Sequence, residues 1–169
     1  EYGAHPAYIE ALARRIEAHW EKTGRPFAEG GKLLMSFHGL PKSCIAKGDR
    51  YEEDCRKTAA LLAERLGLKE NEWLLAFQSR FGKEEWLTPY TEPTLRELGK
   101  AGVPRVDVVC PGFASDCLET IEEIDDEARR AYEESAENGR FEYIPALNDC
   151  DDAVALYARL ALEALGRKT

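Results

Sequence analysis

The chain has no paired-cysteine motif and no glycine-rich phosphate loop, and each absence excludes a class of protein. None of its five cysteines lies in a CxxC pair, which argues against a structural zinc site or a cysteine-held iron–sulfur cluster. Their odd number and scattered spacing argue against a disulfide framework, so we expect most of them to be small buried hydrophobic residues. Neither GxGxxG nor the Walker A pattern occurs, and dinucleotide-binding and P-loop functions therefore have no support.

Long apolar runs and basic clusters are also missing. No apolar stretch approaches the ~20 residues of a membrane span, and no signal-peptide pattern is present. The net charge is −9 and no basic stripe exists to neutralise phosphates, which argues against nucleic acid as a partner and favours cations. We expect a cytosolic or other reducing location. The chain begins at Glu1 without a Met, and we expect a fragment of a longer protein that lacks its N-terminal part.

The chain is 169 residues long, which is the length of one domain, and its predicted strands and helices alternate. Hydrophobic periodicity and turn residues predict strands over residues 33–37, 73–77, 105–110 and 141–144. Helices are predicted over 6–22, 51–66, 92–99, 117–136 and 150–165. This alternation predicts a doubly wound α/β fold, a mostly parallel four-stranded sheet with helices on both faces.

Unusual polar residues gather in three predicted loops, over residues 38–49, 78–90 and 111–117. All three leave the carboxyl ends of strands, where ligands bind in sheets of this kind. The long 78–90 loop carries Arg80 and Lys83, either of which could meet a carboxylate on a ligand. Its aromatic residues Phe81, Trp86 and Tyr90 could cover a flat apolar ligand, or they could simply seal the loop onto the core.

An acidic row follows the third strand. Glu119, Glu123 and Glu127 are spaced four apart on the predicted helix, where like charges repel unless a cation or protons lie between them. This pattern suggests a site that handles a hard or borderline metal ion. Purely structural roles stay open as well, because Asp116 and Glu119 fit a capping box and the remaining acids fit a solvated helix face.

His38 directly follows a predicted buried strand and precedes Gly39, which suggests a side chain that projects into a cleft. There the imidazole could exchange a proton near neutral pH or bind a metal. A histidine that only hydrogen-bonds its own loop fits the position equally well. His5 and His19 fit structural or solvated roles better. Cys117 could have a thiolate favoured by the dipole of the helix it opens, but no nucleophile arrangement would use it.

The strings LLMSFHGLPKS, GDRYEEDC, FQSRFGKEEWLTPYT and CPGFASDCLETIEEIDDE occur in that order, and FEYIPALND lies near the end. Together they resemble the C-terminal half of the ferrochelatase family, whose members insert ferrous iron into a porphyrin to make haem. The resemblance runs from about His5 to Leu165 and covers nearly the whole chain. It implies two similar doubly wound halves with the active site between them, and it identifies residues 1–169 as the C-terminal domain.

The resemblance also implies roles for particular residues. His38 matches the family's active-site histidine, assigned to metal binding or to removal of pyrrole protons. Glu119 matches the glutamate that faces this histidine across the porphyrin site. Glu123 and Glu127 fall on the family's carboxylate row, thought to conduct metal or protons.

Porphyrin and ferrous iron are the substrates that the resemblance implies. Gln78 and Trp86 lie in the motif that borders the porphyrin pocket, and Arg80 is our candidate for a substrate carboxylate. No organic cofactor is required. The cysteines that hold a 2Fe–2S cluster in some members are absent, so no cluster is expected. Much of the porphyrin clamp belongs to the missing N-terminal half, and we expect this chain alone to be inactive.

Several alternatives stay open. Many relatives carry His where this chain has Cys117, which removes one outer metal ligand. A cobalt or nickel chelatase acting on sirohydrochlorin, and a non-catalytic module that binds tetrapyrroles or metals, both fit the same residues. The sequence also leaves open protoporphyrin against coproporphyrin as substrate, a homodimer, and a peripheral membrane contact of the parent protein.

Overall fold

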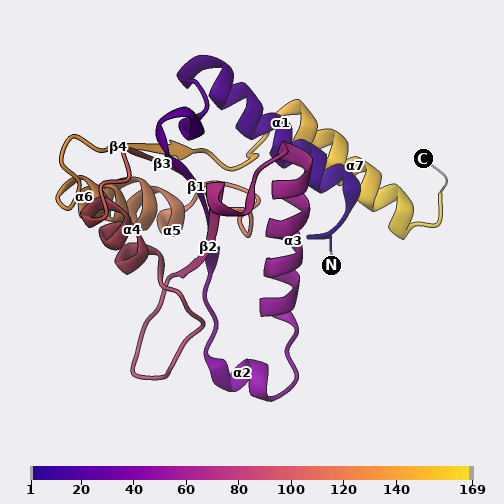
Figure 1. Cartoon of the computed structure of the whole chain (residues 1–169). Helices are drawn as coiled ribbons and strands as arrows, with labels where there is room; N and C mark the ends of the chain where they lie inside the picture. The colour runs from indigo at the N-terminus through magenta and orange to yellow at the C-terminus, as the bar shows by residue number, and fades with distance from the viewer. Residues whose placement is uncertain (1, 168–169) are drawn as a thin grey trace.

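The computed structural model of the chain describes residues 2–167 and shows a four-stranded, all-parallel sheet (Figure 1). The strands are β1 (Lys32–His38), β2 (Trp73–Gln78), β3 (Arg105–Val109) and β4 (Arg140–Ile144). Their order across the sheet is β2-β1-β3-β4. The predicted doubly wound α/β fold is confirmed, and each predicted strand is present with ends shifted by at most one residue.

Helices cover both faces of this sheet (Figure 1). One face packs against α1 (Pro6–Thr23), α3 (Tyr51–Leu66) and α7 (Asp151–Ala164), and the other against α4 (Thr91–Lys100) and the segment 118–133. Three short elements were not predicted: η1 (Pro26–Glu29), α2 (Lys42–Ala46) and η2 (Glu70–Glu72). None of the described helices is long and apolar enough to cross a membrane.

The predicted helix over 117–136 is wrong in its geometry and its end. It consists of α5 (Leu118–Thr120), a π-helix η3 (Ile121–Ala128) and α6 (Arg129–Glu133). In a π-helix each N–H bonds to the carbonyl five residues earlier, so one turn holds more residues than in an α-helix. Apolar periodicity read at 3.6 residues per turn does not separate the two forms over only eight residues.

The alternation of side chains along β1 decides which residues meet the π-helix. Leu33, Met35 and Phe37 belong to the core beneath α1 and α3, whereas Leu34 belongs to the core beneath α4 and η3. Ser36 has the same parity as Leu34, so its hydroxyl faces the η3 side of the sheet. A buried polar residue therefore lies on the sheet face that packs against α4 and the segment 118–133, called the acidic helix below.

The histidines at the start and end of α1 have structural roles, as predicted. His5 accepts a hydrogen bond from the N–H of Ala7 through Nδ1 and contacts Glu163 through Nε2, at 3.2 and 3.1 Å. His19 lies 3.6 Å from Glu142. Both join α1 to neighbouring elements, far in sequence from the three loops of interest.

The expectation that most cysteines are buried is wrong. All five are free thiols, and only Cys55 and Cys110 are buried; Cys44, Cys117 and Cys150 are partly exposed. The reason is their position in the fold. Cys44 lies in the short helix α2, and the other two precede the first residues of α5 and α7.

Close packing of α4 on the end of α6 generates a stability prediction. A Cβ at Gly99 would lie 2.9 Å from Cβ of Ser135 and 3.0 Å from the backbone N of Ala136. We therefore expect Gly99→Ala to destabilise the chain by about 1–3 kcal/mol through overpacking. The urea midpoint of the purified chain is the measurement, and the exposed neighbour Lys100→Ala is the control. Equal or greater stability in Gly99→Ala, from the better helix propensity of Ala, would show that the helices are farther apart.

Candidate functional site

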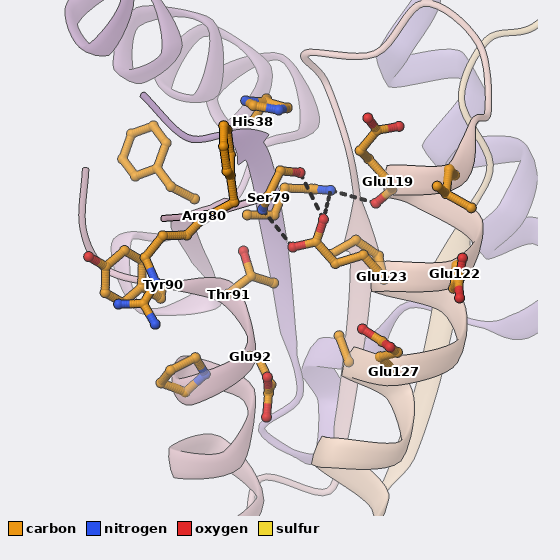
Figure 2. Close-up of a pocket in the computed structure, with 17 residues that line it drawn as sticks. His38, Ser79, Arg80, Tyr90, Thr91, Glu92, Glu119, Glu122, Glu123 and Glu127 are labelled. Carbon is orange, nitrogen blue, oxygen red and sulfur yellow. Dashed lines mark hydrogen bonds between the residues drawn. The ribbon is translucent and has the colours of Figure 1, made fainter. Parts of the chain in front are cut away.

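A cavity of about 670 Å³ opens at the carboxyl edge of the sheet. One wall is formed by the end of β2, the following loop and α4, and the other by α5 and η3 (Figure 2). Of the three predicted loops, the 78–90 loop lines this cavity, the 38–49 loop contributes only His38, and none of residues 111–117 is among the lining residues. The lining residues are His38, Phe77, Gln78, Ser79, Arg80, Phe81, Tyr90, Thr91, Glu92, Pro93, Leu118, Glu119, Glu122, Glu123, Ile124, Glu127 and Ala128.

His38 is the last residue of β1 and is half-buried at the cavity. Its Nδ1 lies 2.7 Å from the carbonyl oxygen of Gly39. A carbonyl only accepts, so the neutral ring carries its proton on Nδ1 and keeps a free lone pair on Nε2. Glycine suits position 39 because the backbone there passes close to the end of β2. A Cβ at Gly39 would lie 3.0 Å from the carbonyl oxygen of Gln78 and 3.1 Å from Trp86. The geometry provides a base or a ligand.

Glu119 lines the same cavity from the opposite wall (Figure 2). A hydrogen bond from the side chain of Cys117 holds its pKa below the ordinary value, with a smaller contribution from the nearby His38. The carboxylate is therefore charged at neutral pH. His38 of β1 and Glu119 of α5 thus line one cavity from separate elements.

Glu123 is held by the chain itself. Its carboxylate accepts a hydrogen bond from the N–H of Ser79 at 2.6 Å and one from the Ser79 hydroxyl at 2.8 Å (Figure 2). Ser79 has φ +63°, a left-handed conformation that costs a non-glycine residue about 1–3 kcal/mol. The two charge-assisted bonds offset this strain. Glu123 therefore braces the π-helix against the end of β2.

The remaining acids of the helix form two groups. Asp125 pairs with Arg129, and Asp126 pairs with Arg130, each at i,i+4 spacing. A solvated, salt-bridged face explains these two aspartates. Within residues 2–167, no ion pair neutralises the cavity-facing Glu122, Glu123 or Glu127 or their neighbour Glu119.

Asp116 does not act as a helix cap. The cap is made instead by Thr120, whose hydroxyl accepts from the N–H of Cys117 at 2.9 Å. Asp116 accepts from the Tyr143 hydroxyl at 2.5 Å, from Asn148 Nδ2 at 2.7 Å and from the N–H of Ala146 at 3.1 Å. Burial alone would raise its pKa, but these hydrogen bonds outweigh it and the pKa lies below the ordinary value. Asp116 thus ties the loop before α5 to the end of β4.

Cys117 does not carry a favoured thiolate. Burial, followed by its hydrogen bond to Glu119, raises its pKa above the ordinary value. A thiol facing a carboxylate keeps its proton, because two adjacent negative charges repel. The backbone N–H groups of Glu119 and Thr120 at the start of the helix lower the pKa, but burial and the Glu119 carboxylate raise it by more.

Different residues of the 78–90 loop fit different roles among those predicted for it. The Arg80 guanidinium stacks over the ring of Tyr90 at 4.7 Å and both line the cavity. Phe81 is 79% exposed at the cavity rim, whereas Trp86 is only 5% exposed and packs beside His38, with ring centroids 6.4 Å apart. Of the two roles predicted for these aromatic residues, sealing fits Trp86, and a free ring face fits Phe81.

Sequence reasoning missed the polar residues that support the acids. Ser36, Ser79 and Thr91 are short hydroxyl residues without a motif of their own. Strand alternation could have placed Ser36 on the face of the acidic helix, but the left-handed turn at Ser79 had no glycine or asparagine to signal it. Among the described residues, no three His, Cys, Asp or Glu side chains form a cluster that could hold a metal.

The family model described as Ferrochelatase matches residues 1–165. The chain belongs to the ferrochelatase family. The resemblance stated from the four sequence strings is confirmed.

Named ferrochelatases from bacteria are similar to most of the chain. The protein of Thioalkalivibrio sulfidiphilus is 52% identical over 162 residues, which are 96% of this chain and 42% of that protein. The Bordetella pertussis protein is 60% identical over 146 residues, 86% of this chain and 39% of that protein. The Aeromonas hydrophila protein is 54% identical over 148 residues, 88% and 44% respectively. The chain thus spans about two fifths of the length of these ferrochelatases.

The Asp116 contacts of this ferrochelatase-family chain predict a pH-dependent stability. In Asp116→Asn an amide NH2 would replace an oxygen that accepts from N–H or O–H donors, and we expect a loss of about 1–3 kcal/mol at pH 7. The folded-state pKa of Asp116 is lowered, so its stabilisation is complete above the pKa of a free aspartate and disappears as the pH falls. The difference between the two proteins should therefore shrink below pH ~4.

Urea unfolding of the purified chain from about pH 3 to about pH 7, a range set by the aspartate pKa, measures this difference. The control is Asp126→Asn, which removes only an exposed ion pair and should change stability by about 0.5 kcal/mol or less. A constant difference across this pH range would show that folding does not lower the pKa of Asp116.

Proposed function

We propose that the chain is the C-terminal domain of a ferrochelatase, whose full-length form inserts ferrous iron into a porphyrin to form haem. The observation that carries the proposal is the pair at the cavity: His38, whose Nδ1 is held by the Gly39 carbonyl, and Glu119, whose carboxylate is charged, line one cavity from separate elements. The family membership and the name of the relatives support the reaction.

The chemistry of insertion requires both groups. A porphyrin loses two pyrrole protons as it takes up a divalent metal, so a base must stand close to the ring nitrogens. The Nε2 atom of His38 is suited to that step, because the Gly39 carbonyl fixes the tautomer. Ferrous iron accepts both imidazole and carboxylate ligands, so His38 and Glu119 can hold it briefly beside the ring.

Glu123 and Glu127, which follow Glu119 along the helix, would guide the metal ion toward His38 and Glu119. Glu127 is exposed and lines the cavity on the same helical row as Glu119 and Glu123, with no ion pair to neutralise it within residues 2–167. Clustered negative charge raises the local concentration of cations and directs them inward. Glu123 would contribute charge to this row while its oxygens stay bonded to Ser79.

The porphyrin would lie over the 78–90 loop. Phe81 offers an exposed ring for stacking on the macrocycle, and Arg80 offers a guanidinium for a peripheral carboxylate. Trp86 would pack against the imidazole of His38 and hold it in place.

Free cysteines throughout the chain are typical of the reducing cytoplasm, which is where we place the protein.

The isolated chain should not insert metal. Its cavity has only the walls described above, and the chain covers about two fifths of its relatives' length. We expect no formation of zinc porphyrin or haem above the uncatalysed rate when the chain is mixed with porphyrin and metal, measured by porphyrin absorbance. The full-length protein under the same conditions is the positive control. Robust insertion by the isolated chain would show that one half carries the entire site.

Replacing the two facing residues in the full-length protein tests the proposed chemistry. His38→Ala should lower kcat for iron insertion by about 10²-fold or more, the usual contribution of a positioned general base. Glu119→Gln should raise the KM for the metal more than the KM for the porphyrin, because it removes a charge from the metal side. Steady-state absorbance kinetics with each substrate varied provides both measurements.

The exposed Glu29→Gln, which lies in η1 away from the cavity, is the control for general effects of losing a carboxylate. Turnover by His38→Ala within about threefold of the unmodified enzyme would exclude His38 as the base. Cobalt with sirohydrochlorin, assayed in parallel, distinguishes a chelatase of that specificity from a ferrochelatase.

A further inference from the structure

Gln78 is almost completely enclosed at the point where the two walls of the cavity meet. It is the last residue of β2 and only 3% exposed. Its Oε1 accepts from the Ser36 hydroxyl at 2.8 Å and from the Cys110 thiol at 3.4 Å. Its Nε2 donates to the backbone carbonyl of Glu119 at 2.6 Å and lies 3.5 Å from a carboxylate oxygen of Glu123. Both ends of the amide therefore have partners.

The orientation of this amide is fixed by its surroundings. The Glu119 carbonyl and the Glu123 carboxylate only accept hydrogen bonds, so the NH2 group must face the helix. The oxygen then faces the sheet, where Ser36 and Cys110 can donate to it. The Ser36 hydroxyl is itself held by Thr91, 2.7 Å away.

Gln78 is also the direct neighbour of His38. The two residues are register partners on the paired strands β1 and β2. One side chain thus joins the strand position beside His38 to the backbone of Glu119. This bond meets the acidic helix just before its π-helical part, which begins at Ile121.

We propose that Gln78 is a positioning residue that sets the separation between His38 and Glu119, and that it does not bind the porphyrin. The inference rests on the proposed function, since it concerns the same pair of groups. It replaces the role that the sequence resemblance implies for Gln78. A residue with this exposure and with partners at both ends of its amide has little left to offer a ligand.

Gln78→Met in the full-length protein tests the proposal. Methionine has a similar length but cannot donate to Glu119, so the acidic helix loses its bond at Glu119 and is held to the end of β2 only by the bonds of Ser79 to Glu123, one turn farther along. A displacement of about 1 Å can lower a rate by about 10²-fold, and we expect kcat for iron insertion to fall by at least about tenfold. The KM for the porphyrin should change by less than about threefold, because no porphyrin contact is removed.

Tyr132→Phe is the matched control. The Tyr132 hydroxyl in α6 donates to the backbone carbonyl of Val103 at 2.5 Å, so its loss also leaves a partly buried carbonyl without a side-chain donor. We expect both variants to lower Tm, but only Gln78→Met to lower kcat. Ser36→Ala is the second variant, in case Gln78→Met does not fold. It leaves Gln78 in place but removes one donor to its oxygen, and a fall of about twofold to fivefold in kcat is expected.

The outcomes separate this inference from the proposed function. A raised porphyrin KM with unchanged kcat would make Gln78 a porphyrin contact and overturn the inference. Unchanged kinetics in Gln78→Met, or in Ser36→Ala if that is the variant that folds, would also overturn it. Absence of insertion by the unmodified full-length enzyme would instead refute the proposed function.

Discussion

The parallel pairing of β1 with β2, in the register that sets His38 beside Gln78, is the constraint on which the site depends. The chain passes from β1 to β2 on one side and then crosses to β3 on the other, so the order β2-β1-β3-β4 reverses direction at β1. Loops that leave the carboxyl ends diverge at such a point and leave a crevice. His38 ends the strand beneath that crevice, and the acidic helix that follows β3 closes over it.

The sequence was enough to predict the strands, the fold class and the placement of His38 and Glu119 at one edge of the sheet, because these depend on periodicity and on the direction of parallel strands. It was not enough to predict the π-helix, because apolar periodicity over eight residues does not distinguish a π-helix from an α-helix. Asp116 fitted a capping pattern, but Tyr143 and Asn148, distant in sequence, compete for its carboxylate and win. A pattern of residues predicts which groups are near, but not which of several donors each acceptor will take.

The acidic helix tolerates its charge because several of its carboxylates have a partner, which is an arginine for some and a hydrogen-bond donor for another. Asp125 and Asp126 are neutralised by arginines one turn along, and Glu123 is stabilised by donors from Ser79. Glu119 and Glu127 line the cavity, and within residues 2–167 neither has an ion-pair partner. The repulsion that the spacing predicts is thus reduced at the positions that hold the fold together. It is retained where an incoming cation would relieve it.

This division also bears on how a metal could be released. An imidazole at His38 and a carboxylate at Glu119 would give a divalent ion two protein ligands, whereas a porphyrin offers four nitrogens in one plane. A protein site that bound iron with a full set of thiolates and imidazoles would compete with the ring for the metal. Two ligands are enough to place the ion and too few to retain it. The hydrogen bonds that join separate elements at the cavity are made around Gln78, Ser79 and Asp116, and not by His38 or Glu119.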